Sequence, residues 1–328
     1  MATSPANKRK AAPAAPKTSP LPMPVPPAPP PVPPPPRDLS KIGDLLDLVK
    51  EASDDEIKRA VASHLDDIAK KYDLSNYHIL YLYDDSSISS RHSNAIYEAA
   101  ASQVSNPRDI LLVVQSGGGR IEPAYLISKT CKSLSAKKFA VVVPRRAKSA
   151  ATLLALGADE IHMGLMSELG PIDPQINGYP ALGLTNALNK VAELSAKFPG
   201  SSAMWAQYLG NKLDLNDLGY FDRISESAAQ YAERLMRGKK LPEGKDYSML
   251  ANHFVNHYKD HGFVIDHDEA LGLLGPEVIK NSTKEYNFGN EVYGFLDFFE
   301  AILGYFKKYS FSLVGAAASI QIRANEKS

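Results

Sequence analysis

Two short segments of this chain carry residues whose types and spacing suit nucleophilic chemistry. The first is a run of three glycines, Gly117, Gly118 and Gly119, which follows an apolar stretch at residues 110–114. The second is Ser149, which stands before a run of small apolar residues. Glycines after a strand bring backbone N–H groups close to a ligand, so this turn could bind a phosphate or a developing oxyanion. A nucleophilic serine beside such a turn indicates acyl transfer, with peptide hydrolysis as the leading case.

Each segment taken alone also has a plain structural interpretation. The glycines fit an ordinary tight turn, and their spacing matches neither the GxGxxG dinucleotide pattern nor a GxxxxGK[ST] phosphate loop. Ser149 fits a helix N-cap, because a serine oxygen there satisfies free N–H groups. The same helix N-terminus would stabilise negative charge near the serine oxygen, and the small side chains of Ala150 and Ala151 leave room for a substrate backbone. The order of the two segments, after neighbouring strands, favours the chemical interpretation.

The surrounding residues predict an α/β fold that would position these segments. Apolar strand-like stretches alternate with segments of helical periodicity, which indicates a parallel sheet with right-handed crossovers. Strands are expected at residues 77–83, 109–115 and 138–143, and helices at residues 42–49, 54–72, 93–102, 123–134 and 149–156. Further helices are expected at residues 181–197, 201–209, 224–237, 247–258 and 266–273. The apolar stretch 310–320 is expected to form a docking helix.

The composition divides the 328 residues into three parts. Residues 1–37 hold most of the 24 prolines, which favour an extended polyproline conformation and predict a disordered tail. This tail is expected to be a spacer, with binding to another protein as the alternative. Residues 38–280 are expected to form the main domain, and residues 281–328 a C-terminal extension.

Charge and cysteine content exclude several classes of protein. Lysine plus arginine equals aspartate plus glutamate at 37 each, so nothing indicates a nucleic-acid-binding surface. The single cysteine, Cys131, excludes an intrachain disulfide and a cysteine-rich zinc site, and it is compatible with a cytoplasmic location. No apolar run reaches about 18 residues, so no membrane span is expected. The proline-rich start of the chain does not resemble a secretory signal.

The motifs around the glycines and Ser149 resemble those of a known family. They lie at residues 115–119, 144–152, 156–161 and 167–175, with a looser histidine–glycine block at residues 261–272. This part of the chain is similar to the serine peptidases of the Clp/crotonase fold. It is closest to the serine dehydrogenase proteinase (SDH) family, which is related to signal peptide peptidase A. The resemblance extends over residues 40–280 and is most specific in its middle.

This resemblance implies an endopeptidase with no cofactor that acts on a peptide or protein. It implies a parallel sheet with repeated ββα units, helical additions at both ends, and assembly into a homo-oligomer. By position, Ser149 is the nucleophile, and the N–H groups of Gly118, Gly119 and Ala150 form the oxyanion hole, with Gly117 in the same substrate-binding turn. One departure is that many relatives carry glycine just after the nucleophile or one position later, where this chain has alanines.

The general base is less well defined by the resemblance. The Clp branch uses a histidine downstream of the serine, but residues 170–173 at the corresponding place contain none. The signal peptide peptidase branch uses a lysine made neutral by burial. Lys190, 41 residues past Ser149 (190 − 149), fits that spacing, and Lys197 is the second choice. His261 is a third candidate, while His162 is expected to be structural.

Neighbouring polar residues leave further alternatives open. Asp173, between two prolines, could orient the base or serve only the fold. Arg145, Arg146 and Lys148 could bind a substrate carboxylate or face solvent. Four histidines fall within residues 253–267, but the HExxH spacing is absent and no metal site is expected.

Two other functions are compatible with the same sequence. One is a catalytically inactive Clp-fold scaffold, whose proline-rich tail would recruit partners. The other is a crotonase-type acyl-CoA enzyme, which shares the oxyanion hole but would not need a serine at position 149.

Overall fold

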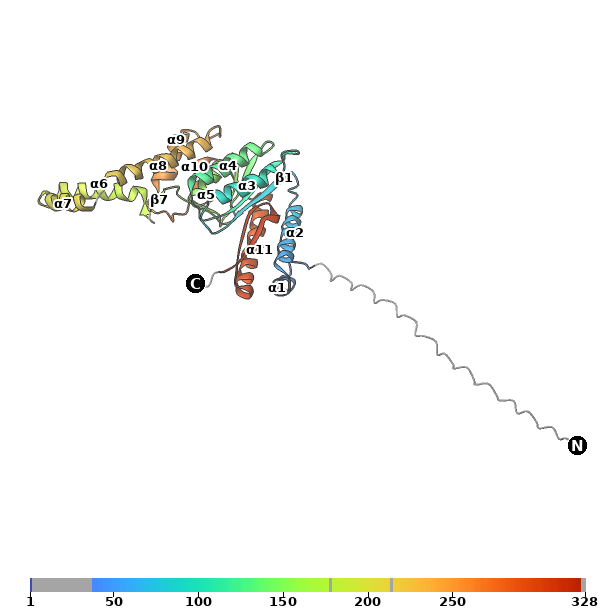
Figure 1. The fold of residues 1–328 in the computed structure, drawn as a ribbon. Helices are drawn as coiled ribbons and strands as arrows, with labels where there is room; N and C mark the ends of the chain where they lie inside the picture. The colour runs from blue at the N-terminus through green and yellow to red at the C-terminus, as the bar shows by residue number, and fades with distance from the viewer. Residues whose placement is uncertain (2–36, 177–178, 213–214, 326–328) are drawn as a thin grey trace. The chain divides into compact units, whose positions relative to one another are not determined.

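A seven-stranded, mostly parallel sheet forms the centre of the fold (Figure 1). The computed structural model describes residue 1 and residues 37–176, 179–212 and 215–325. The strand order is β11-β10-β1-β2-β3-β5-β9. Their bounds are β1 (Tyr77–Tyr83), β2 (Asp109–Gln115), β3 (Phe139–Val142), β5 (Glu160–His162), β9 (Ile279–Lys280), β10 (Tyr309–Gly315) and β11 (Ile320–Ala324). The predicted α/β class is confirmed, because β1, β2, β3, β5 and β9 pair in parallel.

The central parallel strands of the sheet are buried on both faces, which explains the continuous apolar runs at residues 110–114 of β2 and throughout β3. Along β2, Ile110, Leu112 and Val114 enter one core, whereas Leu111 and Val113 enter the other. The first core is covered by α3 (Ser90–Ala101), α4 (Ile121–Leu134) and α5 (Ala150–Ala155). The second is covered by α1 (Ile42–Glu51), α2 (Asp54–Lys71) and α11 (Lys284–Lys307), on the opposite side of the sheet (Figure 1).

The C-terminal segment differs from the sequence prediction. Residues 310–320 do not form the expected docking helix; β10 pairs antiparallel with β1 and with β11. Buried Phe311 and Leu313 alternate with less buried Ser310 and Ser312, and this period of two is typical of a strand. The segment predicted as a C-terminal extension therefore adds a helix and two strands to the main sheet.

A second, smaller layer of strands follows the ends of the main ones. β4 (Arg146–Ala147) pairs in parallel with β6 (Glu168–Leu169). Single bridges extend this layer from Ser116 to Ala147, from Leu169 to Ile265, and from Ile88 to Gly119. Segments that are distant in the sequence thus meet directly beside the glycines and Ser149.

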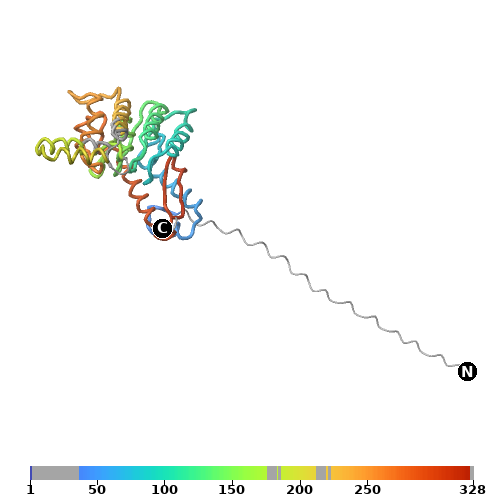
Figure 2. Tube along the Cα trace, turned by 60° about the vertical axis from the view of Figure 1, so that its left-hand side comes forward, coloured from blue at the N-terminus to red at the C-terminus, as the bar shows by residue number. Residues whose placement is uncertain are grey.

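The remaining helices lie between residues 181 and 274. A helical projection extends away from the sheet and consists of α6 (Ala181–Lys197), α7 (Ser202–Lys212) and α8 (Leu215–Met236) (Figures 1 and 2). The helix predicted at 247–258 is divided into α9 (Tyr247–Asn252) and a π-helical turn at His253–His257, followed by α10 (His267–Leu274). Among the described residues, no helix combines the length and apolar character needed to cross a bilayer.

Candidate active site

Ser149 has a strained backbone at the entrance to α5. Its φ of 53° and ψ of −120° lie outside the regions that side-chain-bearing residues normally occupy. Its hydroxyl makes no capping hydrogen bond to the helix, so an N-cap role does not account for the serine. Strained residues at sharp strand-to-helix turns are typical of exposed nucleophiles.

The segments around Ser149 hold this geometry in place. Lys148 N–H donates to the Ser116 carbonyl at 3.1 Å, which ties the serine to the glycine turn. The Thr152 hydroxyl donates to the Ala147 carbonyl at 2.6 Å and accepts from Gly170 N–H at 2.9 Å. Ala147, Ala150 and Ala151, which lie close to Ser149 in the sequence, are fully buried. The turn is therefore fixed from both sides and cannot relax without breaking these contacts.

The glycine turn lies directly against the serine, as the sequence predicted. Gly118 has a φ of 101°, and a Cβ atom there would be 2.8 Å from the Cβ of Ser149 and 3.1 Å from the nitrogen of Ala150. Gly119 has a φ of 149°, and a Cβ atom there would overlap the Ile88 backbone. Gly117 by contrast has open space around it. Only glycine allows this close approach at positions 118 and 119.

The predicted oxyanion-hole donors differ in their present partners. Gly118 N–H donates to the Ser116 hydroxyl at 3.2 Å, so it is already engaged. Within the described residues, no acceptor is seen for Gly119 N–H. Ala150 supplies the first N–H of α5, at the positive end of that helix. Gly119 and Ala150 are thus the donors best able to receive a developing oxyanion.

Asp173 and His261 form a hydrogen-bonded pair although they are 88 positions apart. The Asp173 carboxylate accepts from His261 Nδ1 at 2.6 Å, with side-chain exposures of 6% and 32% respectively. The antiparallel bridge between Leu169 and Ile265 explains the contact, because residues after 169 run beside residues before 265. The proton on Nδ1 leaves Nε2 free to act as an acceptor, as a general base requires.

Lys148 connects this pair of segments to the serine. Its ammonium donates to the Leu169 carbonyl at 3.3 Å and the Phe263 carbonyl at 3.0 Å, and it lies 2.8 Å from the Glu168 carboxylate. The Lys148 side chain therefore connects the residue before Ser149 to the segments that lead to Asp173 and His261. The sequence alone indicates that Lys148 binds a substrate carboxylate or faces solvent, and no local pattern indicates this connecting role.

The other base candidates lie in different surroundings. Lys190 is on the projecting α6, where its side chain is 68% exposed and paired with Glu193 at 3.0 Å. Such exposure does not supply the burial that would make a lysine neutral. Lys197 is also exposed, with its ammonium 5.5 Å from the centre of the Phe198 ring. His162 is buried and bonds to Thr283 at 2.8 Å, in agreement with a structural role.

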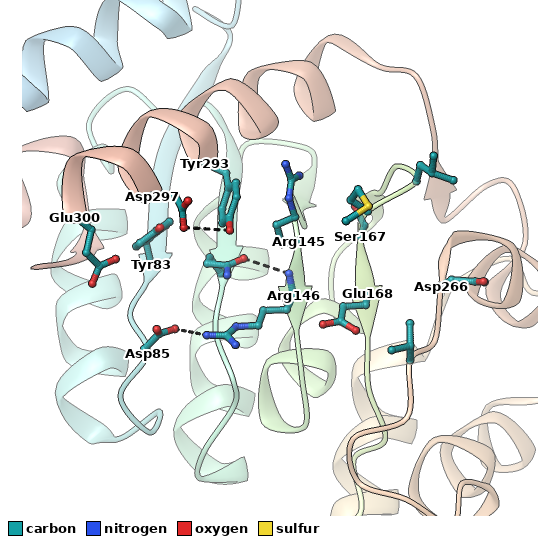
Figure 3. Close-up of a pocket in the computed structure, with 14 residues that line it drawn as sticks. Tyr83, Asp85, Arg145, Arg146, Ser167, Glu168, Asp266, Tyr293, Asp297 and Glu300 are labelled. Carbon is teal, nitrogen blue, oxygen red and sulfur yellow. Dashed lines mark hydrogen bonds and ion pairs between the residues drawn. The ribbon is translucent and has the colours of Figure 1, made fainter. Parts of the chain in front are cut away.

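A pocket of about 540 Å³ lies beside the second strand layer, between its outward side chains and α11 (Figure 3). Arg146 pairs with Asp85 at 2.6 Å across this pocket, and the Arg145 guanidinium lies 4.5 Å from the ring centre of Tyr293. Burial, followed by repulsion from nearby aspartates, raises the pKa of Glu300 to about 7. Ser149 and His261 do not line this pocket. Two of the three predicted basic residues thus face the pocket rather than the serine.

The histidine-rich segment at residues 253–267 brings two imidazole rings together. The rings of His253 and His257 stack with centres 4.1 Å apart. Within the part of the chain that the structure describes, no three histidine, cysteine or acidic side chains converge as metal ligands would.

Residues 86–197 match the model of a family described as ClpP-like SDH-type serine proteinase. The resemblance predicted from the sequence and the Clp-like fold are confirmed, and this part of the chain is similar to that family. The matched segment contains the glycine turn, Ser149 and Asp173. His261 lies outside it, so the match alone does not define the base.

Curated relatives match shorter stretches. The uncharacterized protein MJ0137 of Methanocaldococcus jannaschii is 40% identical over 86 residues, which are 26% of this chain and 30% of that protein. The uncharacterized protein MJ1495 of the same organism is 37% identical over 82 residues, or 25% of this chain and 28% of that protein. The chain therefore aligns with less than a third of the length of these relatives.

Solved structures with a similar arrangement include two mutants of the 1510-N membrane-bound stomatin-specific protease. The first, with a serine replaced by alanine, has a TM-score of 0.40 and 15% identity, over 62% of this chain and 78% of that chain. The second, with a lysine replaced by alanine and a substrate peptide bound, has a TM-score of 0.40 and 15% identity, over 63% and 76%.

Proposed function

We propose that this protein is a serine peptidase that hydrolyses peptide bonds through an acyl-enzyme on Ser149. The observation that carries the proposal is the strained backbone of Ser149, packed against the glycine turn with its hydroxyl free of any capping role. The family match over residues 86–197 supports the reaction class. The substrate would be a peptide or a protein.

The reaction would proceed in two steps. The Ser149 hydroxyl attacks the scissile carbonyl carbon while His261 Nε2 takes its proton, and Asp173 stabilises the imidazolium that forms. The carbonyl oxygen becomes an oxyanion that accepts hydrogen bonds from Gly119 and Ala150, with Gly118 available once its bond to Ser116 is released. His261 then gives its proton to the leaving amine. Water, activated by the same histidine, hydrolyses the acyl-enzyme and regenerates the serine.

His261 is favoured over Lys190 as the base for two reasons. The carboxylate of Asp173 holds its ring in one orientation and leaves Nε2 as a proton acceptor. Lys190 is instead exposed and paired with Glu193, so it lacks the burial that a lysine base requires. Lys190 stays as the alternative base, and fluorophosphonate labelling of variants tests it alongside His261.

The predicted assembly, compartment and tail partner also stay proposals. Assembly into a homo-oligomer draws support from exposed apolar side chains on the helical projection, which include Phe198, Met204 and Tyr208. The cytoplasm is the proposed location, and the proline-rich tail is proposed as a spacer or as a ligand for another protein.

A second candidate function is the catalytically inactive Clp-fold scaffold. One observation favours it. Gly118 N–H already donates to the Ser116 hydroxyl, which leaves fewer free N–H donors for an oxyanion. A crotonase-type acyl-CoA enzyme is the third candidate, and a CoA thioester binding assay separates it from the other two.

Labelling with a fluorophosphonate, followed by intact mass and peptide mapping, tests the proposal. Wild-type protein should gain one adduct at Ser149, and the Ser149→Ala variant should gain none there. The His261→Ala variant should lose labelling while Lys190→Ala keeps it. A folded wild type without any adduct, in its assembled state, would favour the scaffold instead.

A further inference from the structure

The loop at residues 84–89 holds the glycine turn by direct backbone pairing. It leaves the end of β1 and leads into α3. Ile88 N–H donates to the Gly118 carbonyl at 2.8 Å, and the Ile88 carbonyl accepts from Arg120 N–H at 2.9 Å. The loop is so close to Gly119 that no side chain fits at that glycine. The position of the glycine turn therefore depends on the position of Ile88.

A single buried histidine joins both ends of this loop. His92 Nε2 lies 3.1 Å from the Asp84 carboxylate at the start of the loop. At the end of the loop, His92 Nδ1 lies 3.0 Å from the Ser89 backbone nitrogen and 2.9 Å from the Ser89 hydroxyl. A backbone N–H can only donate, so Nδ1 is the unprotonated nitrogen and Nε2 donates to Asp84. The ring thus closes residues 84–89 into a loop of fixed span.

The surroundings make this connection stronger than an ordinary surface contact. His92 is only 1% exposed, and Asp84 is buried as well. Burial alone would raise the pKa of Asp84, but hydrogen bonds from His92 and Ser86 outweigh it and bring the pKa to about 2. Arg91 lies 3.6 Å from the same carboxylate, and Asp84 N–H donates to the Gln115 carbonyl at 3.3 Å. Buried polar groups of this kind are costly to leave unpaired, so the network resists displacement.

Ser89 and His92 also form the capping box that starts α3, because the Ser89 side chain faces the His92 backbone N–H and the His92 ring accepts from Ser89 N–H. Capping boxes ordinarily use a glutamate or glutamine at the position of His92. The start of the helix does not explain the second contact of the ring, from Nε2 to the buried Asp84 carboxylate. This contact connects the cap to the other end of the loop.

We propose that Asp84, His92 and Ser89 form a positioning network that holds the glycine turn in register with Ser149 through Ile88. None of the three contacts the substrate. This inference rests on the proposed role of the glycine turn as the oxyanion hole. Loss of the network would weaken stabilisation of the transition state more than it weakens binding of the ligand.

Substitutions of His92 can separate the two ends of the network. His92→Asn keeps an acceptor for Ser89 but is too short to reach Asp84. His92→Gln has one amide that either accepts from Ser89 N–H or donates to Asp84, so it does not hold both ends as the ring does. His92→Ala loses both, and Ser89→Ala removes only the hydroxyl contact. His78→Gln is the matched control, because His78 also joins β1 to α3, through the Ala99 carbonyl at 2.9 Å, without touching the loop.

Two measurements on the full chain test the network. The first is fluorophosphonate labelling of Ser149, with the limiting rate separated from the inhibitor's dissociation constant. We expect His92→Ala to lower the limiting rate about 100-fold and the one-sided variants about tenfold, with little change in the dissociation constant, because a donor misplaced by about 1 Å loses about that much. His78→Gln should label like wild type.

The second measurement is amide hydrogen exchange at Ile88 and Arg120, the two donors of the loop–turn pairing. His92→Ala should accelerate their exchange at least tenfold relative to His78→Gln. This readout does not depend on an active serine, so it tests the network even if wild-type protein fails to label. Wild-type labelling rates in His92→Ala, or unchanged exchange in both His92→Ala and Ser89→Ala, would overturn the inference. If His92→Ala does not fold, Ser89→Ala and His92→Gln decide it.

Discussion

A Cβ atom on Gly118 would lie 2.8 Å from the Cβ of Ser149, and 2.6 Å from the carbonyl oxygen of Lys148. The proposed nucleophile and the turn proposed to stabilise its oxyanion are therefore in van der Waals contact. Gly118 also has a φ of 101°, which side-chain-bearing residues rarely adopt. Both the surrounding atoms and the backbone conformation therefore restrict position 118 to glycine.

Gly118→Ala should lower the free energy of unfolding by about 2–4 kcal/mol and abolish labelling of Ser149, because the clash is with backbone atoms and the dihedral is strained. Gly117→Ala is the control, since a Cβ there meets nothing within 4 Å and the residue has no positive φ. Chemical denaturation and fluorophosphonate labelling measure the two effects. Equal stability and labelling in both variants would show that the turn is not in contact with the serine.

Lys148→Met should disconnect Ser149 from the segments that carry Asp173 and His261. The ammonium bonds to two carbonyls and pairs with Glu168 in a mostly buried position, so we expect a loss of about 1–3 kcal/mol in the free energy of unfolding. We also expect at least tenfold slower labelling. Lys129→Met serves as the control, because Lys129 is exposed and exposed substitutions usually change stability by less than about 0.5 kcal/mol. If both variants have the same free energy of unfolding and the same labelling rate, Lys148 does not connect these segments.

The main strands could be predicted from sequence because their signal is local. Residues 79–83 and 110–114 are uninterrupted apolar runs, and a strand buried on both faces needs such a run. The C-terminal strand was missed because the alanines at residues 316–318 suggested a helix, whereas the alternation of Phe311 and Leu313 with serines carried the true signal. Pairing with β1 decided between these two local preferences.

The candidate site could be predicted only where consecutive parallel strands bring its residues together. The turn and Ser149 follow adjacent parallel strands, so the fold class alone brings them together. Lys190 was selected by its separation from Ser149, but sequence separation does not fix distance once a helical projection is inserted. The pairing of Asp173 with His261 depends on a bridge between Leu169 and Ile265, which no short pattern in the sequence specifies. The dihedral angles of Ser149 are likewise a product of tertiary packing.

Asp173→Asn should slow labelling of Ser149 by about 100- to 10,000-fold with little effect on folding. The amide can donate as well as accept, so it no longer favours the His261 tautomer with a free Nε2. Asp268→Asn is a matched control, because Asp268 bonds to His267 Nδ1 at 2.9 Å in an exposed pair. The rate of fluorophosphonate labelling of Ser149, determined at several pH values, measures the effect. Full reactivity in Asp173→Asn would remove His261 as the oriented base.

Glu300 should make the protein less stable as the pH rises through the neutral range. Burial, with repulsion from Asp85, Asp297 and Asp84, raises its folded-state pKa to about 7 from an ordinary value of 4.5. Between these two values the folded state binds more protons than the unfolded state, so the free energy of unfolding falls with increasing pH and the full cost is present above pH 7. After allowance for screening by solvent in the open pocket, that cost is about 1–2 kcal/mol.

Glu300→Gln should therefore be more stable than wild type at pH 8 by about 1–2 kcal/mol and equal to it below about pH 4.5. Denaturation midpoints across this range measure the difference, with Glu243→Gln, at an exposed position, as the control that should follow wild type. If the Glu300→Gln and wild-type curves stay parallel from pH 4.5 to pH 8, the glutamate does not change protonation in this window. Glu300 lines the pocket and Ser149 does not. Glu300→Gln should therefore be labelled at Ser149 at the wild-type rate over the same pH range.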